Sequence, residues 1–281
     1  MSIIMRHVLS VLTVIILLFV SCSKTNSQNL AAGKGAAESN QHNTDQALLD
    51  QVKPILDEAG IPADHAQRVL TALASGPAFI QDLQAALSGD PYLRVLVDKQ
   101  HALPLGYEPA DLTGLKDSSY RVSRQGLMLR RPAADALEKM ATAARQEGIT
   151  LIASSTYRTY AYQETVYARN VRESGQATAD RESARPGHSQ HQLGLVVDFG
   201  SIDDSFAETP GGRWILANAS SFGWSLSFPQ GYESVTGYRW ESWHYRYVGQ
   251  SLTHFIDTYF GGIQQYALQF LYAWETLKTP L

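Results

Sequence analysis

Residues 184–201, "ARPGHSQHQLGLVVDFGS", combine an apolar run with two histidines and an aspartate. The second half of this stretch, "LGLVVDFG", is apolar enough for a buried strand, yet Asp198 lies within it. An ionised carboxylate in such a place is costly unless it is paired or coordinates a metal ion. The sequence therefore predicts a partner for Asp198. Whether this partner is a metal ion or a charged side chain, the segment that supplies it must pack against this strand.

One candidate partner is His191, which lies in the same stretch. The odd separation between His191 and Asp198 would place them on opposite faces of a continuous strand. Gly194 removes this difficulty because it allows the chain to turn, so that His191 belongs to a loop and only the following residues are extended. The alternative is structural, with Arg213 or Arg246 pairing with the carboxylate.

A second stretch, "ESWHYRYVG" at residues 241–249, also places polar side chains within strand-like sequence. If residues 242–247 form a strand, His244 faces one side of it and Glu241 would face the other. For both side chains to reach one site the chain must bend near Glu241. We therefore expect Glu241 at the edge of a loop and His244 just inside the strand.

Together these stretches contain the side chains of a metal-dependent hydrolase. Two imidazoles and one carboxylate suit zinc and leave its fourth tetrahedral position for water, and the set here would be His191, Asp198 and His244. A further carboxylate, Glu241, would act as general base, since zinc lowers the pKa of its water to about 7. The same ligand types also form the iron site of non-haem oxygenases, so the pattern alone leaves both classes open.

The surrounding sequence mixes helices and strands without a regular βαβ repeat, which favours an α+β domain. We expect a helix from Pro132 that Gly148 ends, a strand over 149–154, and a helix from Tyr160 to Ser174. Residues 176–190 are predicted as a loop. Beyond them we expect the strands already described, a helix around residues 213–222, a strand over 224–228, and a helical tail broken at residues 261–262.

The N-terminal part of the chain is organised differently. Residues 1–21 carry Arg6 and then an apolar run that is too short for a transmembrane helix, so they are predicted to be a cleaved signal peptide. Cys22, the single cysteine, is the predicted site of lipidation. Residues 22–46 are polar and are predicted to form a flexible, lipid-anchored tether. Residues 47–90 show helical periodicity in about three short helices.

Composition limits the partners of the protein. The chain has 281 residues, 44% of them hydrophobic, and a formal net charge of −4. This length is enough for one large domain with an appendage. The sequence contains no Lys/Arg run or basic patch, so we expect no binding to nucleic acid.

Three stretches resemble the motifs of a known family, the zinc D-alanyl-D-alanine carboxypeptidases of the VanY type, with the related L,D-carboxypeptidases that trim peptidoglycan stems. They are "SSTYRTYAYQ" (154–163), "PGHSQHQLGLVVDF" (186–199) and "ESWHYRYVG" (241–249). In addition, "LVDKQHALPLGYEPADL" (96–112) is similar to the entry to the catalytic domain of these enzymes. The resemblance implies a zinc carboxypeptidase domain over residues 91–281.

The resemblance also implies a fold and a set of residue roles. The fold would be a small antiparallel sheet flanked by helices, of the hedgehog and D,D-peptidase type, preceded by the short helical region. His191, Asp198 and His244 would bind zinc, Glu241 would be the catalytic base, and Arg158 would bind the oxyanion or the terminal carboxylate of the substrate. The substrate pocket would be lined by Ser155, Gln163 and Ser189, with His188 near its mouth and not a ligand.

From these features we expect a lipoprotein, exported and anchored to the membrane through Cys22, that removes the C-terminal D-alanine from peptidoglycan stem peptides. One alternative is L,D-carboxypeptidase activity on tetrapeptide stems, since both activities share the motifs. Another is a non-catalytic, zinc-binding protein that recognises the cell wall. The intact Glu241 and Arg158 argue against the second alternative, because such a protein has no need of a base.

Overall fold

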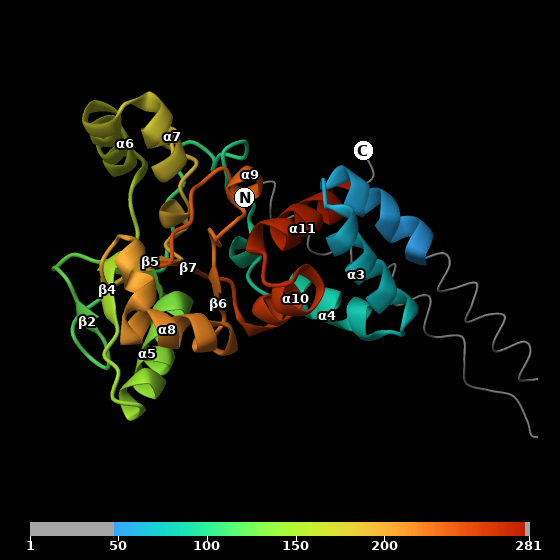
Figure 1. Ribbon diagram of the computed structural model, residues 1–281, viewed down its shortest axis with the longest axis horizontal. Helices are drawn as coiled ribbons and strands as arrows, with labels where there is room; N and C mark the ends of the chain where they lie inside the picture. The colour runs from blue at the N-terminus through green and yellow to red at the C-terminus, as the bar shows by residue number, and fades with distance from the viewer. Residues whose placement is uncertain (1–47, 279–281) are drawn as a thin grey trace, which may run out of the picture.

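The computed structural model describes residues 48–278. The predicted signal peptide at 1–21, the predicted tether at 22–46 and the lipidation site at Cys22 lie outside the described residues. Among the residues that are described, no helix has the length and apolar character needed to cross a membrane. Two hydrophobic cores organise this part of the chain, one around a five-stranded sheet and one among helices from both ends of the sequence (Figure 1).

The five-stranded sheet has the order β2-β4-β5-β7-β6. Its strands are β2 (Arg121–Val122), β4 (Ile152–Ser155), β5 (Val196–Phe199), β6 (Trp224–Leu226) and β7 (His244–Tyr247). The pairs from β4 to β6 are antiparallel, whereas the short β2 pairs with β4 in parallel at one edge. The predicted α+β fold with a small antiparallel sheet is thus confirmed, and β2 is a parallel addition to it.

The register of the central strands brings functional positions side by side. Asp198 on β5 is directly opposite His244 on β7, and Ser155 on β4 is opposite Asp198 on the other side. All four residues of β5 are buried, because the strand is central in the sheet and covered on both faces. This burial explains the apolar run that surrounds Asp198 in the sequence.

Helices cover the sheet at the positions predicted from the sequence. Helix α5 (Arg131–Gln146) begins beside Pro132, ends before Gly148 at a φ of +78°, and buries one face made largely of small residues. Helix α8 (Pro210–Asn218) is capped by the Thr209 hydroxyl, which accepts a hydrogen bond from the Gly212 amide. The same layer contains η4 (Asp204–Glu208) and η5 (Ala219–Phe222). A separate two-stranded antiparallel sheet of β1 (Leu112–Gly114) and β3 (Met128–Arg130) leads into α5.

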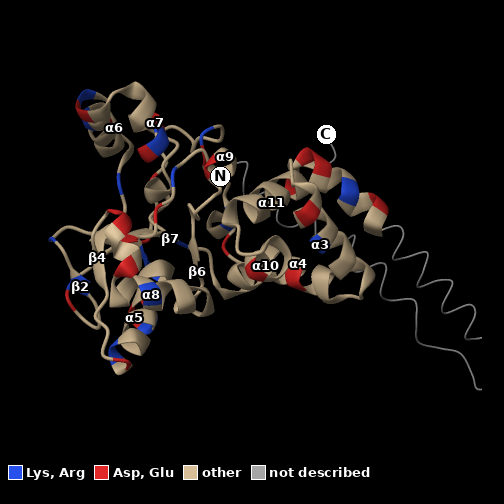
Figure 2. Ribbon diagram, in the orientation of Figure 1, with Lys and Arg blue, Asp and Glu red and all other residues tan. Residues whose placement is uncertain are grey.

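One predicted loop contains a helix. The predicted helix α6 (Tyr160–Ser174) is present, but residues 176–182, predicted as loop, form α7 (Gln176–Glu182). The prediction failed because α7 buries only Ala179 and so has no apolar stripe. Lys and Arg are intermingled with Asp and Glu over α6 and α7, which project together from one end of the sheet (Figures 1 and 2).

The second core joins helices that are far apart in the sequence. Residues 48–58 are helical, and α3 (Ala63–Ala74) and α4 (Ala78–Leu87) follow, which confirms the predicted helical region. They pack against α10 (Gln250–Phe260) and α11 (Gln264–Lys278). The rings of Phe79 and Phe255, one from each end of the chain, have centroids 5.6 Å apart. We call these five helices the helical unit; a domain boundary near residue 90 stays a prediction.

Candidate active site

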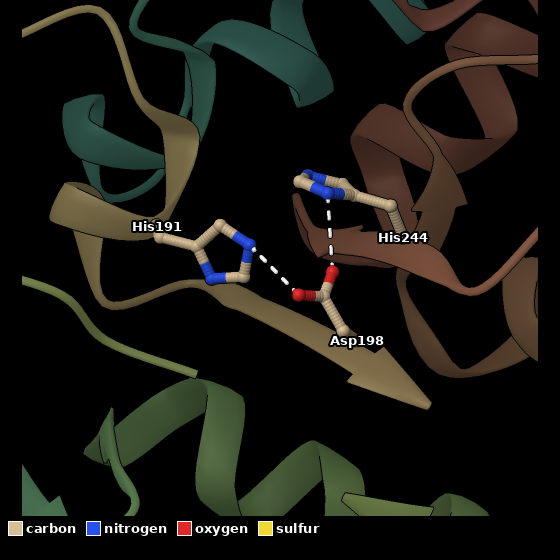
Figure 3. Close-up of side chains that lie close together, drawn as sticks. All are labelled: His191, Asp198 and His244. Atoms are coloured by element: carbon tan, nitrogen blue, oxygen red, sulfur yellow. Dashed lines mark ion pairs between the residues drawn. The ribbon is translucent and has the colours of Figure 1, made fainter. Parts of the chain in front are cut away.

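Three buried side chains from different backbone segments converge at the centre of the sheet. His191 lies in η3 (Gln190–Leu193), Asp198 on β5 and His244 at the start of β7. Their ligand atoms all lie within 4.8 Å of one another. His191 Nε2 is 3.2 Å from Asp198 Oδ2, and His244 Nδ1 is 3.2 Å from Asp198 Oδ1 (Figure 3). These separations are close to the edge, about 3.3 Å, of a tetrahedron with zinc–ligand bonds of about 2.0–2.1 Å.

Gly194 makes the convergence of His191 and Asp198 possible, as predicted. It has a φ of +68° and ends η3 immediately before the extended chain begins. A Cβ atom at this position would lie 3.0 Å from both Arg130 Cγ and Leu112 Cδ2. The turn therefore requires glycine for its conformation and also for the close approach of neighbouring side chains.

The hydrogen bonds of the histidines suit a metal ion. His191 Nδ1 lies 2.7 Å from the Thr156 carbonyl oxygen, so this nitrogen donates and Nε2 presents its lone pair to Asp198. Asp198 Oδ1 and His244 Nε2 are buried and have no hydrogen-bond partner among the described residues. Although His244 Nδ1 is near Asp198 Oδ1, their geometry is not that of a hydrogen bond, which fits two lone pairs directed at a shared cation. The three residues therefore fit a zinc ion.

The electrostatics of the cluster also favour a cation. Burial lowers the pKa of His191 to about 4, and Arg158 adds to this effect. For His244, burial lowers the pKa, but the nearby carboxylates of Asp198 and Glu241 outweigh it and raise the value to about 9. Burial would raise the pKa of Asp198, yet the two imidazoles hold it well below its usual range. The carboxylates of Asp198 and Glu241 thus favour a positive charge at this point.

Glu241 lies at the predicted bend before β7. Its Oε2 atom is 3.2 Å from His244 Nδ1, so it reaches the same point as the three ligand candidates. Burial raises the pKa of Glu241 above its usual value, and His244 partly offsets that effect. A carboxylate with a raised pKa in this position can accept a proton from a water molecule and later return it.

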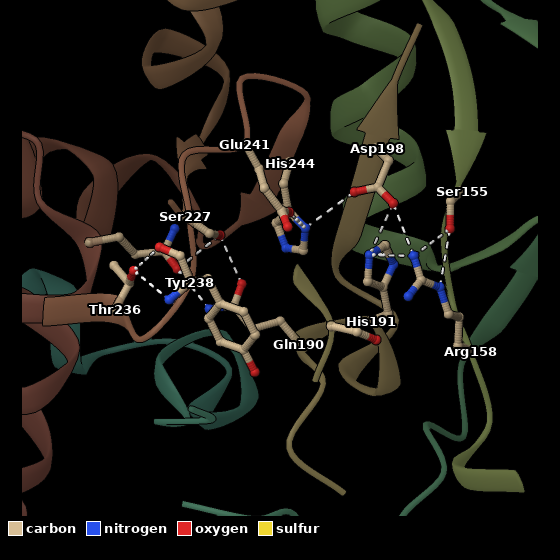
Figure 4. Close-up of polar contacts among 12 residues, drawn as sticks. Ser155, Arg158, Gln190, His191, Asp198, Ser227, Thr236, Tyr238, Glu241 and His244 are labelled. Carbon is tan, nitrogen blue, oxygen red and sulfur yellow. Dashed lines mark hydrogen bonds and ion pairs between the residues drawn. The ribbon is translucent and has the colours of Figure 1, made fainter. Parts of the chain in front are cut away.

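Arg158 lies beside the cluster on the opposite side from Glu241 (Figure 4). Its Nη2 donates to Asp198 Oδ2 at 3.0 Å and lies 3.1 Å from His191 Nε2. Ser155 Oγ accepts from both Nε and Nη2 of this arginine, and Gln163 Oε1 accepts from Nη1. Ser155 and Gln163 therefore hold the guanidinium at the site, and their direct contact with substrate stays a prediction.

A cavity of about 300 Å³ opens over the cluster. Its wall includes the predicted Ser189, the three ligand candidates, Glu241 and Arg158, and its far side is formed by α6, with Val166, Arg169 and Asn170. His188 also lines it, and its Nδ1 lies 2.7 Å from the Asp98 carbonyl oxygen. His188 is outside the metal-binding group. Its place near the mouth of the site stays a prediction.

The alternative prediction, that Arg213 or Arg246 pairs with Asp198, is wrong. Arg213 pairs with Glu208 on the surface, and Arg246 donates to the carbonyl oxygens of Leu93 and Val95. The arginine that does contact Asp198 is Arg158.

The sequence did not reveal a buried amide and hydroxyl cluster behind the histidines. Ser227 Oγ donates to Gln190 Oε1 at 2.8 Å, and Gln264 from α11 lies against both. Gln190 could have been noticed because it precedes His191 in "HSQHQLG". No local signal connects Gln264 with Gln190, which lies 74 residues earlier in the chain.

Comparisons with known proteins agree with this geometry. The VanY family, described as D-alanyl-D-alanine carboxypeptidase, matches residues 126–250, which include all the side chains of the cluster. The chain is 32% identical over 254 residues to YodJ of Bacillus subtilis (strain 168), named as a carboxypeptidase, with 88% of this chain and 89% of YodJ covered. It is also 32% identical over 202 residues to a D-alanyl-D-alanine carboxypeptidase of Enterococcus faecalis (strain ATCC 700802 / V583), covering 67% and 71% of the two chains.

Solved structures show the same fold. The LdcB LD-carboxypeptidase, whose structure is described in terms of peptidoglycan recognition, is 35% identical with a TM-score of 0.54, covering 60% of this chain and 85% of that one. A vancomycin-resistance D,D-pentapeptidase VanY from a VanB-type cassette, in complex with Zn(II), is 29% identical with a TM-score of 0.54, covering 63% and 99%.

Proposed function

The chain belongs to the VanY family of D-alanyl-D-alanine carboxypeptidases, and from that premise we propose that it is a zinc-dependent enzyme that removes the C-terminal D-alanine from peptidoglycan stem peptides. The observation that carries the proposal is the convergence of His191, Asp198 and His244 within 4.8 Å, with Glu241 and Arg158 on either side. Membership of a carboxypeptidase family removes the iron-oxygenase alternative.

The proposed mechanism assigns one role to each group. When bound by His191, Asp198 and His244, zinc would lower the pKa of a water molecule and polarise the scissile carbonyl. Glu241 takes the proton of the attacking water and returns it to the leaving amine. Arg158 donates to the developing oxyanion or to the terminal carboxylate, for which its fork of donors is suited.

A second candidate is L,D-cleavage of a tetrapeptide stem. The similarity to the LdcB LD-carboxypeptidase, at 35% identity, supports this second candidate. The cluster at the reacting bond serves both reactions, because the same water, base and oxyanion donors are needed to hydrolyse either peptide bond.

One assay tests the metal and the substrate together. The purified protein is incubated with pentapeptide and tetrapeptide muropeptides, as isolated, after chelation and after zinc is restored, and the products are identified by mass spectrometry. We expect loss of one D-alanine from the pentapeptide, abolished by chelation and restored by zinc. Cleavage of the tetrapeptide alone would establish the L,D-activity instead, and a zinc-loaded protein that cleaves neither would overturn the proposal.

We further propose that the protein is exported and held at the membrane by lipid on Cys22. The support is the sequence of residues 1–21 and the polar tether that follows. An anchored enzyme could reach stem peptides near the membrane surface. A Cys22→Ala variant is expected to lose membrane association, and its retention there at the level of the unchanged protein would contradict lipid anchoring.

A further inference from the structure

We propose that Gln264 and Gln265, the first two residues of α11, are positioning residues that hold the loop carrying His191 from the side of the helical unit. Both side chains are buried, at 1% and 5% exposure, although they lie in a helix whose other buried residues are apolar. A buried amide is stabilised only when its donors and acceptors find partners, so its contacts indicate what it holds. The kinetic part of this inference rests on the proposed function.

Gln264 contacts the segments next to both histidine ligands. Its Nε2 donates to the Ser225 carbonyl oxygen at 3.2 Å, and its Oε1 accepts long hydrogen bonds from Ser227 Oγ at 3.4 Å and Gln190 Nε2 at 3.5 Å. Ser227 Oγ donates a shorter bond of 2.8 Å to Gln190 Oε1. All of these side chains are buried, so water does not replace the bonds within the cluster.

The cluster lies directly behind the metal-binding side chains. Gln190 precedes His191 in η3, and the Ser227 amide donates to the His244 carbonyl oxygen at 3.1 Å. Ser227 and Gln190 lie on one side of His244 and Glu241, whereas Arg158 and Ser155 lie on the other (Figure 4). The two histidines are therefore supported from two directions, and the support from α11 is the one that lies outside residues 126–250.

Gln265 supports His188, at the start of the same loop, through Asp98. Its Nε2 donates to Asp98 Oδ2 at 2.7 Å, while Asp98 Oδ1 accepts from the backbone amides of Gln100 and His101. The Asp98 carbonyl oxygen accepts from Nδ1 of His188, which lines the cavity. Gln264 thus contacts Gln190 directly, and Gln265 is linked to His188 through Asp98.

The helical unit provides the rigid base that such support needs. Gly261 and Gly262, with φ of +62° and +81°, turn the chain so that α11 begins beside the sheet. The rest of α11 is held by aromatic packing against other helices, with the ring centroid of Phe270 5.6 Å from that of Phe260 on α10 and 6.1 Å from that of Phe79 on α4. Because α11 is fixed by this packing, the side chain of Gln264 can in turn restrict Gln190. Residues that contact the neighbours of metal ligands orient the ligands in this way.

The test replaces Gln264 with leucine, which is similar in size and has no hydrogen-bonding group. We expect Gln264→Leu to weaken zinc binding and to lower kcat, each by about 10–100-fold, with KM nearly unchanged, as for other residues that orient metal ligands. The matched control is Gln84→Leu on the exposed face of α4, in the same helical unit, which is expected to change neither value.

A double-mutant cycle separates positioning from general destabilisation. If Gln264 acts through Gln190, the losses of zinc affinity in Gln264→Leu and Gln190→Leu are not additive, and the double variant resembles the worse single one. Fully additive losses, or a folded Gln264→Leu protein whose zinc affinity and kcat stay within twofold of the unchanged protein, would overturn the inference.

Hydrogen exchange gives a result that depends on neither metal nor substrate. The amides of Gln192 and Gly194 donate to the carbonyl oxygens of Ser189 and His191, and their protection reports whether this loop stays closed. We expect faster exchange at both in Gln264→Leu and no change in Gln84→Leu. Unchanged exchange would reject the positioning role, whereas a protein without zinc binding or peptidase activity would reject only the proposed function.

Discussion

The sheet and the helical unit are both held by apolar cores, but they differ in what else they bury. Around the sheet, Asp198, Glu241 and His244 are at most 7% exposed. Within residues 48–278, the helices of the helical unit bury no charged side chain, and their core is rich in aromatic rings such as Phe79 and Phe255. Buried charge opposes stability unless it is compensated, so its concentration around the sheet marks the part of the molecule that performs chemistry.

The largest expected effect comes from Glu241→Gln, which should affect activity and spare stability. The amide cannot accept a proton, so kcat is expected to fall roughly 10²–10⁴-fold. His191, Asp198 and His244 keep their positions, so zinc affinity and the unfolding midpoint should be nearly unchanged. The measurements are steady-state kinetics, chelator competition and thermal unfolding. Full activity in a folded, zinc-loaded variant would refute the assigned role of Glu241.

The opposite pattern is expected from Phe255→Ala in the helical unit. Phe255 is fully buried, and its ring lies 5.1–6.2 Å from Tyr259, Phe260, Phe270 and Phe79. Its truncation should lower the free energy of unfolding by about 3–5 kcal/mol. The kcat of the molecules that remain folded should fall far less than in Glu241→Gln.

Urea titration of Phe255→Ala measures this loss. The control is Leu277→Ala on α11, where the side chain is 52% exposed and the expected change is within about 0.5 kcal/mol. A loss below about 1 kcal/mol for Phe255→Ala would show that the helical unit contributes little to global stability.

The smallest effect is expected at Asp98, where the two regions meet. Burial would raise the pKa of Asp98, but hydrogen bonds from two backbone amides, His101 and Gln265 hold it below its ordinary value of 3.8. Folding therefore favours the ionised form, and its stabilisation is present above pH 3.8 and is lost as the pH falls through the lower folded pKa.

Asp98→Asn tests this link between the regions. At about pH 6 the variant should be less stable than the unchanged protein by about 1–2 kcal/mol, and the difference should shrink once the pH falls below about 4. Urea titrations at several pH values measure it. A difference that is independent of pH down to about pH 2 would show that the charge of Asp98 does not stabilise the junction.

Local elements were predictable where the chain marks their ends. Helix α6 has the predicted limits because Thr159 caps its start and Gly175 follows its end. The turn at Gly194 was predictable because only glycine allows His191 and Asp198 to meet. Helix α7 was missed because it has no apolar stripe, and the parallel pairing of β2 was missed because a strand of two residues has little pattern.

Contacts between distant segments were the least predictable part. His191, Asp198 and His244 could be predicted as a group because their chemistry requires a common partner. The packing of α10 and α11 against the N-terminal helices leaves no local trace, since each helix shows an apolar face without indicating what covers it. For the same reason the contact of Gln264 with Gln190 emerges only from the structure.

The helical unit joins helices of residues 48–87 with helices of residues 250–278, which are made at different times during synthesis. Residue 87, the end of α4, leaves the ribosome long before residue 278, the end of α11. At roughly 5–20 residues per second, the early helices wait about 10–40 s for their partners. The last strand of the sheet, β7, ends at residue 247, so the sheet can close shortly before α11 is complete. The helices of residues 48–87 therefore belong to the last core to close.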